Sequence, residues 1–431
     1  MAETHVPGQA DSVKRESSPV PQQSSVPATQ GLTHVAHNVA RGSHDLLSNP
    51  ATQELPAEYR DNADRIVSDY LEVLRGEKVL FICNQNPKDS DPRFIEVMCD
   101  AVRKKGGDAT VFTIRPGEDQ NAELEALLAS HNMFWIASET SDETMPVKFD
   151  RILEIIEDPT KRMADCTGVQ VDALADTGVL GERRDVVEGR LQEMDEKLNG
   201  MAGFHIKTEL GTDLWMDMVS GRPWYKASGW IPRGSWDNLP GGEIFTTPDE
   251  DHVDGTLVLT TVHNDVTPER GVDQPVKLTV KDGKIINIEG GESAAKLREY
   301  FERNAKLEKD PMAVYSCAEI AFGANANAPA VPEGPACEGW REDGPSAIVT
   351  EKRFKSMHIA FGDTNHGGPA IRGKNSARTH LDFVLSQKGL TVHAFKDRGA
   401  YEAARAENRP EAGEAIIENG DYRLITPKTP S

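Results

Sequence analysis

The chain has 431 residues, and at roughly 100–200 residues per domain this length predicts two folded domains. Its formal net charge of −22 disfavours nucleic acid and anionic lipid as partners, because phosphate binding requires clustered Lys and Arg. The sequence contains no apolar run of the roughly 18–20 residues that a membrane helix needs, and its N-terminus lacks the order of a secretory signal. We therefore expect a cytoplasmic protein with no membrane segment and no nucleic-acid partner.

Residues 1–55 are rich in Ser, Pro, Gln, Thr and Ala and contain few large apolar side chains. Such a segment cannot bury enough apolar surface to offset the entropy lost on ordering, so it is predicted to be a disordered tail. The five cysteines of the chain are scattered and include no CxxC pair. They are predicted to be reduced thiols inside a cell, with Cys317 a packing residue.

Residues 56–200 alternate between helical and extended patterns. Apolar residues recur at helical spacing between Tyr59 and Leu74, KVLFIC at 78–83 has the pattern of a buried strand, and further helices and strands follow. This alternation predicts a parallel sheet covered by helices, and hence an N-terminal α/β domain. The loop after KVLFIC lacks a GxGxxG motif, so no dinucleotide site is predicted there.

Residues 201–431 change to short alternating strands separated by turns rich in Gly, Pro and Asp. LTVKDGKIINIEG predicts a hairpin around Asp282–Gly283, a pair favoured in tight turns. The fold class is therefore α/β, with the parallel-sheet domain at 56–200 followed at 201–431 by an α+β, strand-rich domain.

The second domain contains five side chains of metal-ligand type: Glu243, Glu319, His358, His380 and Asp382. His380 and Asp382 are two positions apart, so in a strand they leave the same face. AEIAFGAN and MHIAFGDT are near-copies, and each places a polar residue at the head of an apolar strand, where a buried charge needs a partner or a metal ion. Three carboxylates and two imidazoles are the mixture that two adjacent divalent cations require.

From about residue 204 to residue 386 the chain resembles the thermophilic metallo-aminopeptidase family, which includes aminopeptidases T and S. The segments that carry the resemblance are GTDLWMD, NLPGGEIFTTPDEDHVDGTLVL, DGKIINIEG, AEIAFGAN, HIAFGDT and GKNSARTHLDFVL. The resemblance implies a homodimer in which Glu243, Glu319, His358, His380 and Asp382 hold two zinc, cobalt or manganese ions. One segment departs from the family pattern, because EKRFKSM stands where the family has an acidic segment before the histidine.

The chain is also similar to 2,5-dihydroxypyridine 5,6-dioxygenase, which uses a single Fe(II) held by two histidines and an aspartate. The HxD motif of that enzyme matches His380 and Asp382, but its first histidine falls where this chain has Glu319. The five-donor pattern therefore favours hydrolysis.

We expect a metal-dependent aminopeptidase that cleaves N-terminal residues from a peptide or small amide through a dinuclear, metal-activated water. Glu319 is assigned as a ligand or general base, His366 as a catalytic residue that acts as an acid or contacts the substrate, and Lys374 as a residue that orients the substrate. Two alternatives remain open. One is a mononuclear Fe(II) ring-cleaving dioxygenase, and the other is a non-catalytic scaffold without metal.

Overall fold

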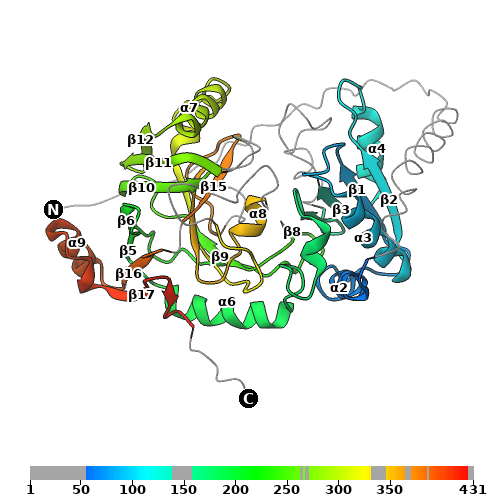
Figure 1. The fold of residues 1–431 in the computed structure, drawn as a ribbon, viewed down its shortest axis with the longest axis horizontal. Helices are drawn as coiled ribbons and strands as arrows, with labels where there is room; N and C mark the ends of the chain where they lie inside the picture. Colours follow the sequence, from blue (N-terminus) through cyan, green and yellow to red (C-terminus); the bar gives the residue numbers. More distant parts are fainter. Residues whose placement is uncertain are drawn as a thin grey trace, which may run out of the picture.

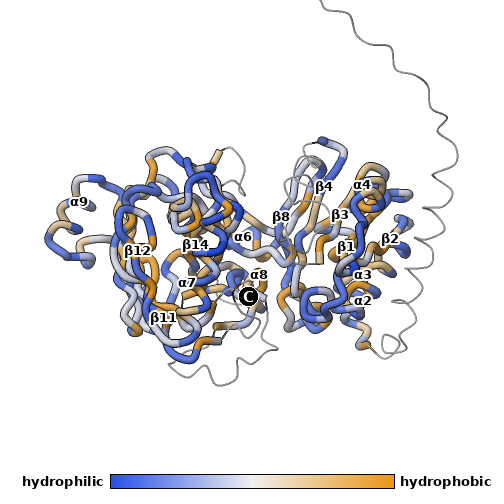
Figure 2. Tube along the Cα trace, turned by 90° about the horizontal axis from the view of Figure 1, so that it is seen from above, coloured by the Kyte–Doolittle hydropathy of each residue, from blue (hydrophilic) through white to orange (hydrophobic). Residues whose placement is uncertain are grey.

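A computed structural model describes residues 55–137, 158–262, 266, 271–331, 346–364, 370–385 and 388–425. The chain forms two lobes, one around a parallel sheet and the other around two antiparallel sheets (Figure 1). Helix α6 (Arg184–Leu198) and the short helix α8 (Ala347–Thr350) lie between the lobes when the molecule is seen from above (Figure 2). The expected α/β class with a strand-rich second part is confirmed.

Sheet A forms the N-terminal lobe, with strand order β2-β1-β3-β4-β8 and every neighbouring pair parallel. Its strands are β1 (Lys78–Cys83), β2 (Asp108–Thr113), β3 (Met133–Ala137), β4 (Arg162–Asp165) and β8 (Trp236–Asn238). Its helices are α2 (Ala57–Arg65), which continues into the π-helical turn η2 (Ile66–Tyr70), α3 (Pro92–Lys104) and α4 (Asn121–Ser130), and a 3-10 turn η3 (Val171–Leu174) follows β4.

Strand β1 is buried on both faces. Val79 and Phe81 join the core that contains α2 and α3, whereas Leu80 and Ile82 join the separate core under α4. Helices thus cover both sides of sheet A, which explains why KVLFIC is an uninterrupted apolar run.

Strand β8 belongs to sheet A although it lies after residue 200, the position at which we divided the chain into domains. It pairs with β4 through contacts such as Asp165 with Asn238. Because the chain returns to the N-terminal lobe, the connection between the lobes involves more than one linker. The division at residue 200 itself stays a prediction.

Sheet B has eight strands in the order β12-β11-β10-β6-β5-β16-β17-β18. They are β5 (Gly203–Lys207), β6 (Asp213–Asp217), β10 (Val253–Thr261), β11 (Gly271–Lys281), β12 (Lys284–Glu289), β16 (Thr391–Phe395), β17 (Glu414–Glu418) and β18 (Asp421–Tyr422). Asp282 and Gly283 join β11 to β12 with φ values of 47° and 71°, so the predicted hairpin is confirmed, with positive φ at both central residues. Helices α7 (Glu292–Ala305) and α9 (Arg398–Glu407) and the 3-10 turns η4 (Ala313–Tyr315) and η5 (Pro410–Ala412) complete this part.

Sheet C has five antiparallel strands in the order β15-β14-β13-β9-β7. They are β7 (Tyr225–Ala227), β9 (Glu243–Thr246), β13 (Cys317–Gly323), β14 (Met357–Gly362) and β15 (His380–Val384). One face of sheet C contributes Ile320, Phe322, Ile359 and Phe361 to a core shared with Phe204 and Leu257 of sheet B. The opposite face is therefore available for polar groups.

Among the described helices, none combines the length and the apolar composition that a membrane-spanning segment requires.

Candidate metal centre

The polar face of sheet C carries a row of metal-type side chains. In the strand register, Glu319 of β13 lies opposite Ala360 of β14, and Ala360 lies opposite Asp382 of β15. Directly opposed residues leave the same face of a sheet, so Glu319 and Asp382 extend on the same side with only a methyl group between them. His380 precedes Asp382 by two residues in β15 and joins them on that face.

Two further donors reach this face from neighbouring rows. His358 lies opposite Ala321 of β13, and Glu243 lies opposite Gly323 at the end of the same strand. Small residues thus occupy the positions between the donors and leave space for them to converge. All five residues selected from the sequence are brought together by this sheet.

A β-bulge in β13 aims Glu319 at the cluster. Two steps from Cys317 to Glu319 on β13 match one step from Phe361 to Ala360 on β14. The extra residue, Ala318, changes the alternation of side chains at the head of the strand. Cys317 consequently belongs to the apolar core, as predicted, and burial raises the pKa of its thiol.

His358 lies at the centre of the cluster. Its Nε2 atom is 3.0 Å from Glu319 Oε1, 3.4 Å from Glu243 Oε2 and 3.7 Å from Asp382 Oδ1. The imidazole is almost fully buried, with 1% of the side chain exposed. Apart from this 3.4 Å approach of the imidazole, Glu243 Oε2 accepts no hydrogen bond from the described part of the chain, and a buried acceptor of this kind indicates a partner such as a cation.

His380 forms the outer side of the cluster. Its Nε2 atom is 3.3 Å from Asp382 Oδ1 and 3.6 Å from Glu319 Oε2. Its Nδ1–H group donates a 2.8 Å hydrogen bond to the carbonyl oxygen of Asp363, which orients the ring and leaves Nε2 to face the carboxylates. This is the arrangement in which a neutral histidine presents a lone pair to a metal ion.

Two residues of the cluster were not selected from the sequence: Glu351 and Lys352, which follow helix α8 in the EKRFKSM segment. The Lys352 Nζ atom donates to Glu243 Oε1 at 2.5 Å and to Glu351 Oε1 at 2.6 Å, and its side chain is 0% exposed. The one feature of the sequence that could have drawn attention to these two residues is the departure of EKRFKSM from the aminopeptidase pattern. Sequence periodicity could not place the segment, because it follows a four-residue helix rather than a strand of sheet C.

Glycine at the end of β13 allows this segment to approach the sheet. A Cβ atom on Gly323 would lie 2.0 Å from the carbonyl oxygen of Arg353. The backbone N–H of Asn325 donates to the Lys352 carbonyl oxygen at 2.8 Å, and the Phe354 N–H donates to the Asn325 carbonyl oxygen at 2.8 Å. The backbone from Lys352 to Phe354 is therefore tied to Asn325, two residues after the end of the strand that carries Glu319.

The pKa shifts in the cluster indicate that its buried carboxylates favour positive charge beside them. Burial raises the pKa of Glu243 to about 8, even though the Lys352 ammonium opposes this shift. Burial by itself would lower the pKa of His358, but its hydrogen bond to Glu319 and the nearby carboxylates outweigh burial and raise the pKa to about 9. For His380 the same competition is decided by Asp382 and Glu319, which raise the pKa to about 10. Protons on the imidazoles or metal ions can supply the missing charge.

Three overlapping groups of ligand atoms are close enough to hold an ion, each within a span of 4.8 Å. They are Glu243–Glu319–His358, Glu319–His380–Asp382 and Glu351–His358–Asp382. Every group consists of two carboxylates and one imidazole. These side chains fit a divalent cation, since oxygen and imidazole donors suit zinc, cobalt and manganese.

The N-terminal lobe closes the cluster from the other side. Asp165 ends β4 and pairs with Asn238, which ends β8 directly after Asp237, and Asn238 Nδ2 lies 3.5 Å from Glu351 Oε1. Burial raises the pKa of Asp237 to about 7, opposed by the charge of Lys352. The centre thus lies between sheet C and the C-terminal edge of a parallel sheet, where α/β proteins commonly bind ligands.

Several residues and segments singled out in the sequence are not part of the described metal cluster. His366, Cys337 and all but the last residue of the predicted tail at 1–55 lie outside the described residues. Lys374, which we assigned to substrate, is 69% exposed and pairs with Asp251 at 2.7 Å. The described contacts do not bring it into the metal cluster.

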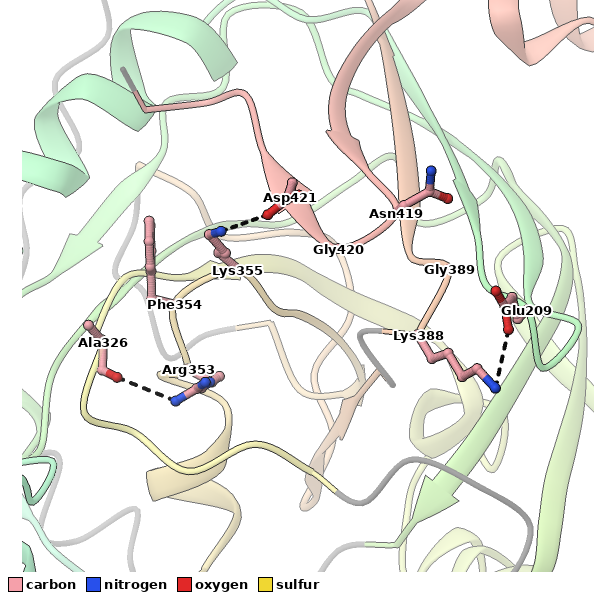
Figure 3. A pocket seen from close by; sticks show the side chains of 10 residues that line it. All are labelled: Glu209, Ala326, Arg353, Phe354, Lys355, Lys388, Gly389, Asn419, Gly420 and Asp421. Carbon is pink, nitrogen blue, oxygen red and sulfur yellow. Dashed lines mark hydrogen bonds and ion pairs between the residues drawn. The ribbon is translucent and has the colours of Figure 1, made fainter. Parts of the chain in front are cut away.

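A cavity of about 650 Å³ lies in the C-terminal lobe, and its lining includes Arg353, Lys355, Lys388 and Asp421 (Figure 3). Ion pairs join Lys355 to Asp421 and Lys388 to Glu209 across it. None of the five metal-type side chains lines this cavity. It is therefore distinct from the metal cluster, although Arg353 follows Lys352 directly in the chain.

Comparison with known proteins identifies the family. The sequence model of the family of 2,5-dihydroxypyridine 5,6-dioxygenase (NicX) matches residues 151–392, which is more than half of the chain. The chain belongs to this family. The matched region contains all five donors of the cluster.

One curated member of the family, the 2,5-dihydroxypyridine 5,6-dioxygenase of Pseudomonas putida KT2440, is 30% identical over 136 residues. The aligned part covers 31% of this chain and 37% of that enzyme, so it spans little more than a third of the relative's length.

Two solved structures share the fold. The 2,5-dihydroxypyridine dioxygenase of Pseudomonas putida KT2440 has a TM-score of 0.58 and 18% identity, covering 86% of this chain and 97% of that one. AmpT from Thermus thermophilus has a TM-score of 0.54 and 14% identity, covering 85% and 99%. The resemblance to the dioxygenase is thus confirmed at the level of family. The resemblance to the aminopeptidases is supported at the level of fold.

Proposed function

We propose that this protein is a metal-dependent hydrolase of peptides or small amides, and specifically an aminopeptidase. The observation that carries the proposal is the composition of the donor groups: each of the three contains two carboxylates and one imidazole. The Fe(II) sites of non-haem oxygenases instead use two histidines and one carboxylate. The fold shared with AmpT supports the same function.

Different residues hold the donor groups together, orient them and support them. Glu319 belongs to two donor groups and therefore holds the cluster together, while His380 and Asp382 complete the outer group. The Asp363 carbonyl fixes the orientation of His380, and the apolar core behind sheet C keeps the strands in register. A divalent ion in this place supplies an activated water and polarises a carbonyl oxygen.

Family membership favours a second function, that of a ring-cleaving dioxygenase for hydroxylated N-heterocycles. The two imidazoles lie 3.7 Å and 3.3 Å from the same Asp382 oxygen, which is the pair of histidines and the carboxylate that Fe(II) would use. Glu319 stands among them as an additional carboxylate that this function does not require.

The two functions are separated by metal loading and by product analysis. Protein loaded with Co²⁺, Mn²⁺ or Zn²⁺ is assayed on a panel of aminoacyl anilides and short peptides. Protein loaded anaerobically with Fe²⁺ is assayed for oxygen uptake with 2,5-dihydroxypyridine. We expect release of N-terminal residues in the first assay, and oxygen uptake in the second with no hydrolysis in the first would overturn the proposal.

The Asp382→Asn variant serves as the matched control for both assays. We expect it to lose at least about 100-fold of the activity, because even the outer partners of metal ligands contribute about 10–100-fold. A protein that retains no metal and hydrolyses no peptide would support the non-catalytic scaffold.

A further inference from the structure

A buried lysine divides the cluster into two unequal halves. The Lys352 ammonium bonds to Glu243 and Glu351, and each of these carboxylates belongs to one of the two donor groups that use His358. The remaining group, Glu319–His380–Asp382, is not among the partners of the Lys352 ammonium in the described part of the chain, and it is the more open to solvent, with 22% of the His380 side chain exposed.

The two sides of the cluster differ in how their carboxylate charges are neutralised. On the inner side, the carboxylates of Glu243 and Glu351 already share one cation, the Lys352 ammonium. On the outer side, the carboxylates of Glu319 and Asp382 face two imidazoles. A second divalent ion on the inner side would have to sit against a buried ammonium, where like charges repel strongly because little water screens them.

The fold holds Lys352 in this place. Its carbonyl oxygen accepts from Asn325 N–H, and the segment lies against Gly323, where a side chain would collide with Arg353. With its side chain fully buried and its backbone tied to Asn325, just beyond β13, Lys352 has no neighbouring solvent into which to withdraw.

We propose that the centre binds one divalent ion, on Glu319, His380 and Asp382, and that the Lys352 ammonium takes the place of a second ion beside Glu243 and Glu351. This inference shares with the proposed function only the assumption that the cluster binds metal. It applies whether the metal serves hydrolysis or oxygen chemistry. It also predicts that removing the ammonium opens a second metal position beside His358, in the groups Glu243–Glu319–His358 and Glu351–His358–Asp382.

The test is metal stoichiometry in the full chain. Metal-free wild type and the Lys352→Met variant are titrated with Co²⁺ under anaerobic conditions, with calorimetry and the visible absorption of bound cobalt as readouts. We expect about one ion per chain in the wild type and about two in the variant. The Lys355→Met variant is the matched control, because Lys355 lies three residues away, is 41% exposed and pairs with Asp421, and it should bind as the wild type does.

The outcomes separate this inference from the proposed function. Two ions in the wild type, or one ion in a folded Lys352→Met variant, would overturn the inference. Neither result would contradict the proposed hydrolase function. If Lys352→Met does not fold, Lys352→Gln provides the neutral variant, and the wild-type count alone still decides whether the ammonium excludes a second ion. A wild type that binds no ion would overturn the inference and the metal-dependent function together.

Discussion

At the scale of single residues, the chemistry of this protein depends on where buried charges find partners. Glu319, like Asp382, belongs both to the outer donor group and to an inner one, and within each group the ligand atoms lie 4.8 Å or less apart. Its side chain is only 4% exposed. A carboxylate in such surroundings is costly unless it is paired, so its partners in the cluster are part of the stability as well as the function of the site.

The Glu319→Gln variant tests this role. Removing one charge from this proposed ligand should weaken Co²⁺ binding by more than the roughly 10–100-fold that outer partners contribute, because a ligand bonds to the ion directly. Binding is measured by calorimetry against Glu292→Gln, a change of an exposed glutamate on α7 that should leave affinity unaltered. Equal affinity in the two variants would remove Glu319 from the metal centre.

At the scale of elements, side-chain alternation explains how four short strands build one site. In β13 and β14 the apolar residues Ile320, Phe322, Ile359 and Phe361 alternate with residues of the polar face. This alternation is visible in the near-copies AEIAFGAN and MHIAFGDT, so the sequence predicted that their head groups would meet. The bulge at the head of β13 was not visible, because it depends on pairing with β14.

The junction between α4 and sheet A carries a pH-sensitive contact. His131 follows α4, and its Nδ1–H donates to the Leu127 carbonyl while Nε2 accepts from the Thr110 hydroxyl of β2. Burial lowers the pKa of His131, opposed by its hydrogen bond to Leu127. As the pH falls below about 6.5, the unfolded chain therefore takes up a proton that the folded chain does not, and stability falls.

We expect the wild type to lose more unfolding free energy between about pH 7.5 and about pH 5.5 than the His131→Gln variant loses. Urea unfolding at the two pH values measures both losses. The exposed His252 provides the control variant His252→Gln, which should retain the wild-type difference. Identical losses in wild type and His131→Gln would show that this imidazole does not couple protonation to folding.

At the scale of the whole molecule, the centre lies between two lobes with different architectures. Sheet C supplies the five donors, the segment after α8 supplies Glu351 and Lys352, and β8 of sheet A reaches Glu351 through Asn238. Metal binding should therefore stabilise the folded chain as a whole, because any ligand that binds only the folded state raises its stability.

Removal of metal by a chelator tests this coupling. With free metal at about 100 times its Kd, binding adds about 2.7 kcal/mol. At roughly 2–4 °C per kcal/mol for domains of 150–250 residues, the chelator should lower Tm by about 5–11 °C. Thermal unfolding followed by circular dichroism measures the shift. Glu319→Gln should show a much smaller change, and an equal shift in that variant would mean that the chelator acts elsewhere.

The sequence by itself determined the class of each lobe, the strands that carry the cluster and the five metal-type side chains that converge in it, because periodicity, turn residues and ligand-type side chains are local properties. Tertiary structure decided that β8 returns to the N-terminal sheet and that Lys352 enters the cluster. The physical reason is that both depend on contacts between segments far apart in the chain: Lys352 and Glu243 are separated by 109 residues, and no local pattern records their meeting. A lysine that looks like a solvated charge in the sequence thus becomes a buried cation beside the metal ligands.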